Sequence, residues 1–326
     1  MKKAVNMDAL AVGLVAAWLG WAILTATLNQ RTQPLMTPYF TSPVFMAFGI
    51  AIGRRLGRRP AEIQIGCAAL AAAAYVLTTV WFVGGPGGGP LGYSNANAAL
   101  AMQLFGLTVL LALSAAGLAR RLLLTAAGLL VVSVVVADCD AANILLLFQV
   151  AAVAFALSSR ARGRWWPVVI GALGVVAALA TVTTLTLLHT WPSRVVAGLS
   201  ETRHQLWRDA LRLWSKNPLL GAGPGSFSHF TPLAKDSTLS TAHMSLFQIG
   251  AETGLIGVAL FTVLVAAAYV IGSRGTPAAT VVVSAAISVL LIHSFVDHLL
   301  EFWPVMLTLG VSLGVVDAAR GPEKCP

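Results

Sequence analysis

Long apolar segments are the feature that most limits what this chain can fold into. A helix needs about 20 apolar residues to cross a hydrocarbon core of about 30 Å. Segments of about this length recur at 8–28, 34–53, 61–83, 97–118, 122–137, 141–157, 165–189, 243–271, 277–296 and 301–318. Because lipid offers no hydrogen bonds to backbone N–H and C=O groups, such segments must be helical. We therefore expect an all-α, polytopic transmembrane helical bundle of about ten spans.

The overall composition agrees with a membrane protein. Of the 326 residues, 57% are hydrophobic and only 10% are charged, too few to cover the surface of a water-soluble domain.

The number of spans could also be lower than ten. Segments 122–137 and 141–157 are short, so they could form a re-entrant pair around Asp138 and Asp140, which would lower the count by two.

The positive charges indicate how the chain is oriented. With both ends placed in the cytoplasm, most of the 21 Lys and Arg residues fall in inner connections, as the positive-inside rule requires. The net charge of +9 thus reflects membrane topology and argues against nucleic acid as a partner. We expect transmembrane helices in 1–189, one large extracytoplasmic loop in 190–242, and further transmembrane helices in 243–326 of a protein of the cytoplasmic membrane.

Histidines concentrate on one side of this predicted topology. All six fall in outer connections or at outer helix ends: His189, His204, His229, His243, His293 and His298. One interpretation is that histidine is tolerated at a membrane interface. The other is a functional site at the boundary between membrane and water on the outer face of the membrane, where no nucleotide is available.

The large loop is predicted to contain an amphipathic helix at 200–216. Ser200 is a suitable N-cap, and Asn217-Pro218 would end the helix. At 100° per residue, Arg203, Trp207 and Trp214 share an apolar stripe, which favours a helix lying on the membrane surface.

Arg203 is the unusual member of that stripe. A permanent cation among apolar residues is costly without an anionic partner. The anion could be a protein carboxylate such as Glu252 or Glu301, or it could be a ligand phosphate, which suits the guanidinium fork. The spacing leaves both possibilities open.

A glycine-rich segment follows the helix. Gly221, Gly223 and Gly225 predict a flexible turn whose backbone N–H groups are available to an anion, but no strand precedes it, which excludes a dinucleotide-binding loop. His243 then opens the next span. Glu252, nine residues on, points to the opposite helix face, so we expect it to pair with another helix rather than with His243.

Two further clusters carry polar side chains. His293 and Asp297 stand one helical turn apart, with Glu301 another turn on, which predicts either a metal site or an Asp–His orientation pair. Asn95 and Asn97 follow a Gly/Pro-rich loop at a helix start, where their amides could cap the helix or bind sugar hydroxyls.

These motifs together resemble the signature of the O-antigen ligase and O-antigen polymerase superfamily. The similarity covers about residues 90–318, and Asn95-x-Asn97 and the Asp297 segment resemble further family features. The motifs that carry it are Arg203-x-x-x-Trp207, Asn217-Pro218-Leu219-Leu220-Gly221-Ala222-Gly223, Ala242-His243 and Gln248-x-x-x-Glu252-x-Gly254-x-x-Gly257.

The resemblance implies a GT-C-like membrane glycosyltransferase of cell-envelope polysaccharide synthesis. Such an enzyme moves a glycan from a polyprenyl (undecaprenyl) diphosphate donor to a hydroxyl of a glycan, lipid or protein acceptor. The transfer takes place at the outer face of the cytoplasmic membrane, with membrane lipid as a partner and without metal, nucleotide or other cofactor. Carried over to this chain, Arg203, Arg194 and Arg208 would hold the diphosphate, and His243 would assist attack or stabilise the leaving group. The supporting and acceptor-side residues would be Glu252, His293, Asp297, Asn95 and Asn97. Met244 departs from the asparagine that often follows the family's histidine.

A transporter or flippase is the competing hypothesis. Glu252, Asp297 and Glu301 could form an ion path through the membrane. The sequence shows no inverted repeat, however, and its polar residues gather on one side, whereas a transport path needs access from both. A scaffold without catalytic activity is a third possibility.

Overall fold

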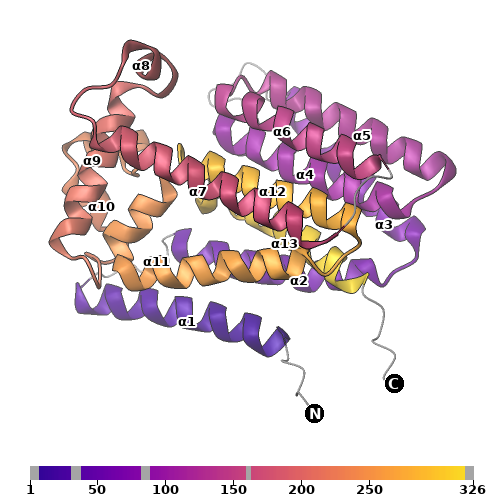
Figure 1. The fold of residues 1–326 in the computed structure, drawn as a ribbon, viewed down its shortest axis with the longest axis horizontal. Helices are drawn as coiled ribbons and strands as arrows, with labels where there is room; N and C mark the ends of the chain where they lie inside the picture. Colours follow the sequence, from indigo (N-terminus) through magenta and orange to yellow (C-terminus); the bar gives the residue numbers. More distant parts are fainter. Residues whose placement is uncertain (1–6, 31–37, 82–88, 159–162, 320–326) are drawn as a thin grey trace. The chain divides into compact units, whose positions relative to one another are not determined.

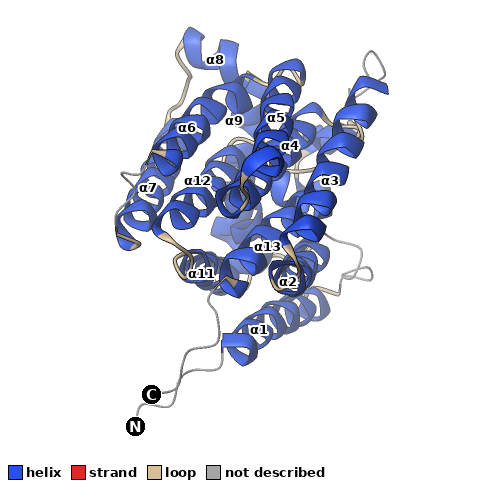
Figure 2. Cartoon of the chain, turned by 90° about the vertical axis from the view of Figure 1, so that its right-hand side faces the viewer, coloured by secondary structure: helices blue, strands red, loops and turns tan. Residues whose placement is uncertain are grey.

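The computed structural model describes residues 7–30, 38–81, 89–158 and 163–319. Within these ranges the chain consists of helices and loops, with no strand (Figure 2). The all-α prediction is therefore confirmed. The chain forms two compact units: a first unit of residues 1–47, 176–267 and 294–303, and a second unit of residues 48–175, 268–293 and 304–326.

Each predicted apolar segment overlaps a helix, and residues 34–37 and 82–83 of two segments lie outside the described residues. The helices are α1 (Met7–Leu28), α2 (Pro38–Gly57), α3 (Ala61–Trp81), α4 (Ser94–Ser114), α5 (Gly117–Val136), α6 (Asp140–Leu157), α7 (Trp165–Leu187), α11 (Ser245–Gly272), α12 (Pro277–Ser294) and α13 (Trp303–Ala318) (Figure 1). Within the described residues, seven helices are long and apolar enough to cross a membrane, and two shorter apolar helices lie at Val12–Leu28 and Trp303–Ala318. The seven include α5 and α6, of 20 and 18 residues, so these two need not be a re-entrant pair.

Short helices fill the connection between α7 and α11. They are α8 (Ser193–Leu199), α9 (Glu201–Lys216), α10 (Ser226–Phe230) and the 3-10 turns η2 (Pro232–Lys235) and η3 (Ser237–Leu239); a further turn, η4 (Leu299–Glu301), precedes α13. Ser200 caps α9 as predicted, because its side-chain oxygen accepts a hydrogen bond from the Arg203 backbone N–H.

Helix α4 is the buried centre of the second unit. All its side chains from Ala96 to Ala112 are buried, and α3, α5 and α6 pack around it. Two buried amides tie it to its neighbours: Gln103 Nε2 donates to the Ala286 carbonyl of α12, and Gln149 Nε2 of α6 donates to the Met102 carbonyl. In an apolar interior each bond gives a buried amide N–H an acceptor.

Close helix contact and one shared carboxylate join α2, α13 and the end of α11 within the second unit. Gly53 of α2 lies so near the Val311 carbonyl of α13 that a Cβ there would overlap it. At the same end, Asp317 accepts from Arg54 Nε at 2.7 Å and from Arg274 Nη1 at 2.8 Å. The two arginines thereby neutralise the carboxylate.

Helix α11 of the first unit is broken at Gly254. This residue has φ +70° and ψ −171°, which a helix cannot contain. The turn that follows α9 supplies the hydrogen bonds that the break removes. Leu255 N donates to Pro218 O and Ile256 N to Leu219 O, while the Ala251 and Glu252 carbonyls accept from Ala222 N and Gly223 N. The break is therefore compatible with an apolar setting, where unpaired backbone groups are costly.

Helix α1 packs beside α11 and contacts it near this break (Figure 1). Trp18 packs with Ile249 and Leu264, and the Trp21 indole N–H donates to the Thr253 carbonyl at 2.9 Å. The kink is thus held by one side chain of α1 and by the backbone of the 217–223 segment.

We predict that Gly254→Ala destabilises the protein. A Cβ at residue 254 would overlap the Leu219 carbonyl, and the positive φ adds strain of about 1–3 kcal/mol. The midpoint temperature of unfolding in detergent should fall. Gly20→Ala is the matched control, because no atom lies within 4 Å of the Cβ it adds. Equal unfolding temperatures for the two variants would contradict the account of the break.

Candidate functional site

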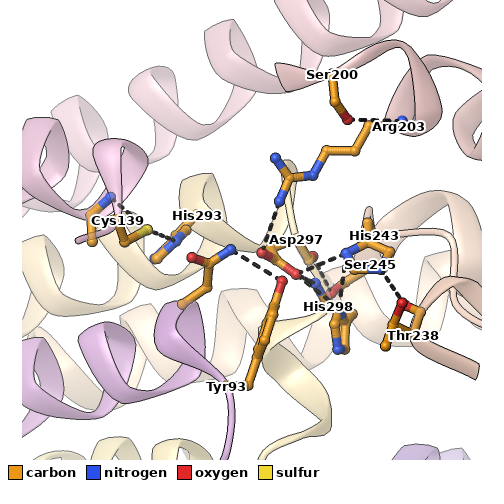
Figure 3. Close-up of polar contacts among 12 residues, drawn as sticks. Tyr93, Cys139, Ser200, Arg203, Thr238, His243, Ser245, His293, Asp297 and His298 are labelled. Carbon is orange, nitrogen blue, oxygen red and sulfur yellow. Dashed lines mark hydrogen bonds and ion pairs between the residues drawn. The ribbon is translucent and has the colours of Figure 1, made fainter. Parts of the chain in front are cut away.

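The buried carboxylate of Asp297 is the centre of the candidate site. It lies in the irregular segment between α12 and α13 and has no exposed surface. Its Oδ1 is 3.3 Å from His243 Nδ1 and 2.8 Å from His298 Nδ1, and its Oδ2 is 3.4 Å from Arg203 Nη2 (Figure 3). One carboxylate thus contacts three basic side chains, one from α9, one from the residues before α11 and one from its own neighbour.

Backbone contacts hold these three parts of the first unit together. The Trp207 indole N–H of α9 donates to the His243 carbonyl at 3.2 Å, and the Ser245 hydroxyl donates to the Asp297 carbonyl at 3.3 Å. Gln248 accepts from the Ala242 N–H just ahead of His243. His243 itself has φ +48°, a left-handed conformation that is uncommon for such a residue and is found at functional sites.

The contacts of His243 assign the roles of its two ring nitrogens. Its Nε2 lies 3.0 Å from the Thr238 carbonyl, which can only accept, so Nε2 carries a hydrogen. The other nitrogen, Nδ1, faces Asp297 and the His298 ring (Figure 3). A proton gained at Nδ1 would therefore be stabilised by the Asp297 carboxylate.

The two carboxyl groups of this segment differ in charge. Burial alone would raise the pKa of Asp297, but His243 and His298, when their rings are protonated, outweigh it through hydrogen bonds and positive charge and hold the pKa well below its usual range. Burial, followed by the negative charges of Glu252 and Asp297, raises the pKa of Glu301 to about 8. At neutral pH Asp297 is the anion of the site and Glu301 is mostly protonated.

Glu252 binds the glycine-rich turn rather than another transmembrane helix. Its Oε2 accepts from Gly225 N at 2.8 Å and its Oε1 from Phe227 N at 3.0 Å. The prediction of a helix partner is wrong, because the 217–227 segment folds back onto α11. The predicted availability of the turn's N–H groups to an external anion is corrected for the same reason. The Gly225 and Phe227 N–H groups donate to the Glu252 carboxylate.

The carboxylates proposed for Arg203 are also corrected. The protein anion beside Arg203 is Asp297, and neither Glu252 nor Glu301.

The apolar face of α9 does not lie on a membrane surface either. Trp207 is fully buried and packs against Trp191, and Asp209 of the same helix is buried and accepts from the Thr231 hydroxyl.

The structure does not bring all the predicted site residues together. Arg194 on α8 and Arg208 on α9 are exposed, and Arg208 points about 140° away from Arg203 around the helix axis. His293 is buried beside Cys139 Sγ at 3.6 Å in the second unit. Helix α12 ends at Ser294, so the one-turn spacing of His293 and Asp297 does not apply.

Asn95 and Asn97 of the second unit have local contacts. The Asn95 amide donates to the Tyr93 hydroxyl at 3.1 Å. Asn97 is buried, and its Oδ1 accepts from Leu91 N at 2.9 Å. Asn97 therefore closes the loop before α4 and does not cap the helix, whose N-cap residue is Tyr93, with no side-chain cap hydrogen bond.

Sequence reasoning overlooked His298 as a site residue. It noted this histidine only as one of six on the outer side. The short distance between the two in sequence, in the segment HSFVDHLLEF, was the available signal.

The family comparison agrees with the motifs. A sequence model of the family described as O-antigen ligase matches residues 129–262. This segment is therefore similar to the O-antigen ligase family. It contains Arg203 and His243, and the predicted relationship to the O-antigen ligase and polymerase superfamily is confirmed. Asp297 and His298 lie beyond the matched residues. No curated protein sequence matches the chain.

We predict that Glu252→Gln loosens the glycine-rich turn. The amide can accept through one oxygen only, so one buried N–H among residues 225 and 227 loses its partner, at about 1–3 kcal/mol. Unfolding in detergent should begin at a lower temperature, and proteases should cleave 217–230 faster. Glu62→Gln, at an exposed glutamate of α3, is the control and should behave as the wild type. Unchanged cleavage of the Glu252 variant would refute this role.

Proposed function

We propose that the chain transfers a glycan from a polyprenyl-diphosphate donor to an acceptor hydroxyl at the outer face of the cytoplasmic membrane, as a ligase or a polymerase. The observation that carries the proposal is the cluster of Arg203, Asp297 and His243. It combines a guanidinium group suited to phosphate with an imidazole suited to proton transfer. The O-antigen ligase family match over 129–262 supports it.

Arg203 is the proposed ligand of the donor diphosphate. Its contact with Asp297 is 3.4 Å, longer than the usual 2.7–2.9 Å of charge-assisted hydrogen bonds, and engages one terminal nitrogen. A guanidinium has five N–H donors, so it can hold a diphosphate while it stays beside Asp297. The side chain is 24% exposed, which leaves it accessible. The exposed Arg194 and Arg208 would add positive charge around the donor.

His243 is the proposed base of the transfer. The acceptor oxygen forms a bond to the anomeric carbon of the donor glycan while its proton passes to His243 Nδ1. The bond between that carbon and the diphosphate oxygen breaks, and the diphosphate leaves with the electron pair. Asp297 stabilises the imidazolium, and Arg203 meets the charge that develops on the leaving group. Because the diphosphate is already a good leaving group, these residues are sufficient without a metal ion.

The transporter alternative loses its main support. It required Glu252, Asp297 and Glu301 as members of an ion path. Glu252 is instead bound by two backbone amides, and Asp297 by basic side chains. These contacts favour a fixed site over a chain of exchangeable carriers. Ion or glycolipid uptake by proteoliposomes that show no glycan transfer would reverse this preference.

We predict that Arg203→Ala lowers kcat/KM for glycan transfer by about 10²–10³-fold, since the charge of the leaving diphosphate loses its partner. Arg203→Lys should recover little, because a single ammonium cannot replace the planar fork. The assay uses proteoliposomes, polyprenyl-diphosphate-linked glycan and candidate acceptors, with products identified by mass. Lys235→Ala removes one exposed charge from the same connection and should transfer normally. Normal transfer by Arg203→Ala would refute the assignment.

We predict that His243→Gln lowers kcat by about 10²–10⁴-fold in the same assay. Glutamine can still contact Thr238 or Asp297 but cannot take up a proton. Removal of the exposed His229 as His229→Gln is the control. If the His243 variant turns over as fast as this control at equal folded protein, His243 is not the base.

A further inference from the structure

Three potential metal ligands of the first unit converge on one point. They are His243 Nδ1, His298 Nδ1 and Asp297 Oδ1 (Figure 3). The two ring nitrogens are 3.3 Å apart, and the carboxylate oxygen lies 3.3 Å from one and 2.8 Å from the other. All three side chains are nearly buried, with exposures of 10%, 14% and 1% for His243, His298 and Asp297.

These separations match the ligand spacing around one small divalent ion. With bonds of about 2.0–2.1 Å, ligands at tetrahedral angles lie about 3.3 Å apart and ligands at right angles about 2.9 Å apart. Two imidazole nitrogens and one carboxylate oxygen favour zinc and similar transition metals, whereas magnesium and calcium prefer oxygen ligands alone. Three protein ligands leave a fourth position for water or a substrate oxygen.

The contacts around the three ligands orient them for a cation. The Thr238 carbonyl takes the hydrogen of His243 Nε2, so the lone pair of the neutral ring is on Nδ1, toward Asp297 and His298. Arg203 contacts the other carboxylate oxygen, Oδ2, and the His298 backbone N–H donates to Oδ1 at 2.7 Å. Arg203 also repels a bound cation, and protons compete for the same nitrogens, so we expect a moderate affinity.

We propose that His243, Asp297 and His298 bind one divalent transition-metal ion of the zinc type, and that the bound ion blocks glycan transfer. The inhibition rests on the proposed function. An ion bound to His243 Nδ1 occupies the lone pair that would otherwise take the proton of the acceptor hydroxyl. The site is therefore an inhibitory one, distinct from a catalytic metal centre.

The binding test needs neither donor nor acceptor. Purified full-length protein in detergent is stripped with a chelator and titrated with Co²⁺, whose visible absorption reports its ligands, and then with Zn²⁺ in competition. We expect one equivalent to bind, and His298→Ala or Asp297→Asn to weaken binding at least about 10-fold. His229→Ala removes an exposed histidine and should bind like the wild type.

Thermal unfolding gives a second measurement that also checks folding. Zn²⁺ should raise the unfolding temperature of the wild type and of His229→Ala, but not of His298→Ala. The site is refuted if the wild type binds no ion at micromolar concentrations, or if the His298 and Asp297 variants bind as tightly as the His229 control.

The inhibition is tested separately with active proteoliposomes. Zn²⁺ should suppress transfer with a midpoint near its measured Kd, and a chelator should restore it. Transfer that continues at saturating Zn²⁺ would refute the inhibition while leaving the site in place. A protein that binds one Zn²⁺ through these residues yet shows no transfer in chelator would instead refute the proposed function.

Discussion

A single buried anion organises the candidate site. Asp297 has no exposed surface, and a carboxylate so placed is stable only with cations or hydrogen-bond donors around it. Arg203 comes to it from α9, His243 from the residues before α11, and His298 from its own segment. Neutralising one charge therefore brings together parts of the chain that are distant in sequence. The two carboxylate oxygens serve different groups, a guanidinium on one side and two imidazoles on the other. Under the proposed function, Asp297 would stand between Arg203, which binds the anionic donor, and His243, which takes the proton of the acceptor.

The broken helix α11 provides the frame for this cluster. Its interrupted hydrogen bonds are completed by the backbone of 217–223, and Glu252 binds the turn that follows. Three residues of the family-like motif, Gln248, Glu252 and Gly254, therefore hold the backbone conformation here. We infer that the motif maintains the position of His243, which lies just ahead of the helix in a strained conformation.

The carboxyl groups of Glu252, Asp297 and Glu301 in the first unit differ in their partners and in protonation. Backbone amides bind Glu252, basic side chains keep Asp297 ionised, and Glu301 is mostly neutral at pH 7 because its pKa is raised to about 8. Three acids so near one another could not all be charged in a buried region. Their separate partners leave Asp297 as the one anion that faces the histidines. This arrangement accounts for both proposals, since the histidine nitrogens beside it attract either a proton or a metal ion.

The sequence by itself determined the helices. Every predicted apolar segment became a helix, and Ser200 caps α9, because hydrophobic runs and caps act over a few residues and lipid allows the backbone few alternatives. It also selected Arg203 and His243, but not what contacts them. Only the tertiary structure decided that Arg203 meets Asp297 across 94 residues, that Glu252 holds the glycine turn, and that His298 joins the site. Such contacts depend on where α11 breaks and where α12 ends, and hydrophobic periodicity does not record either position.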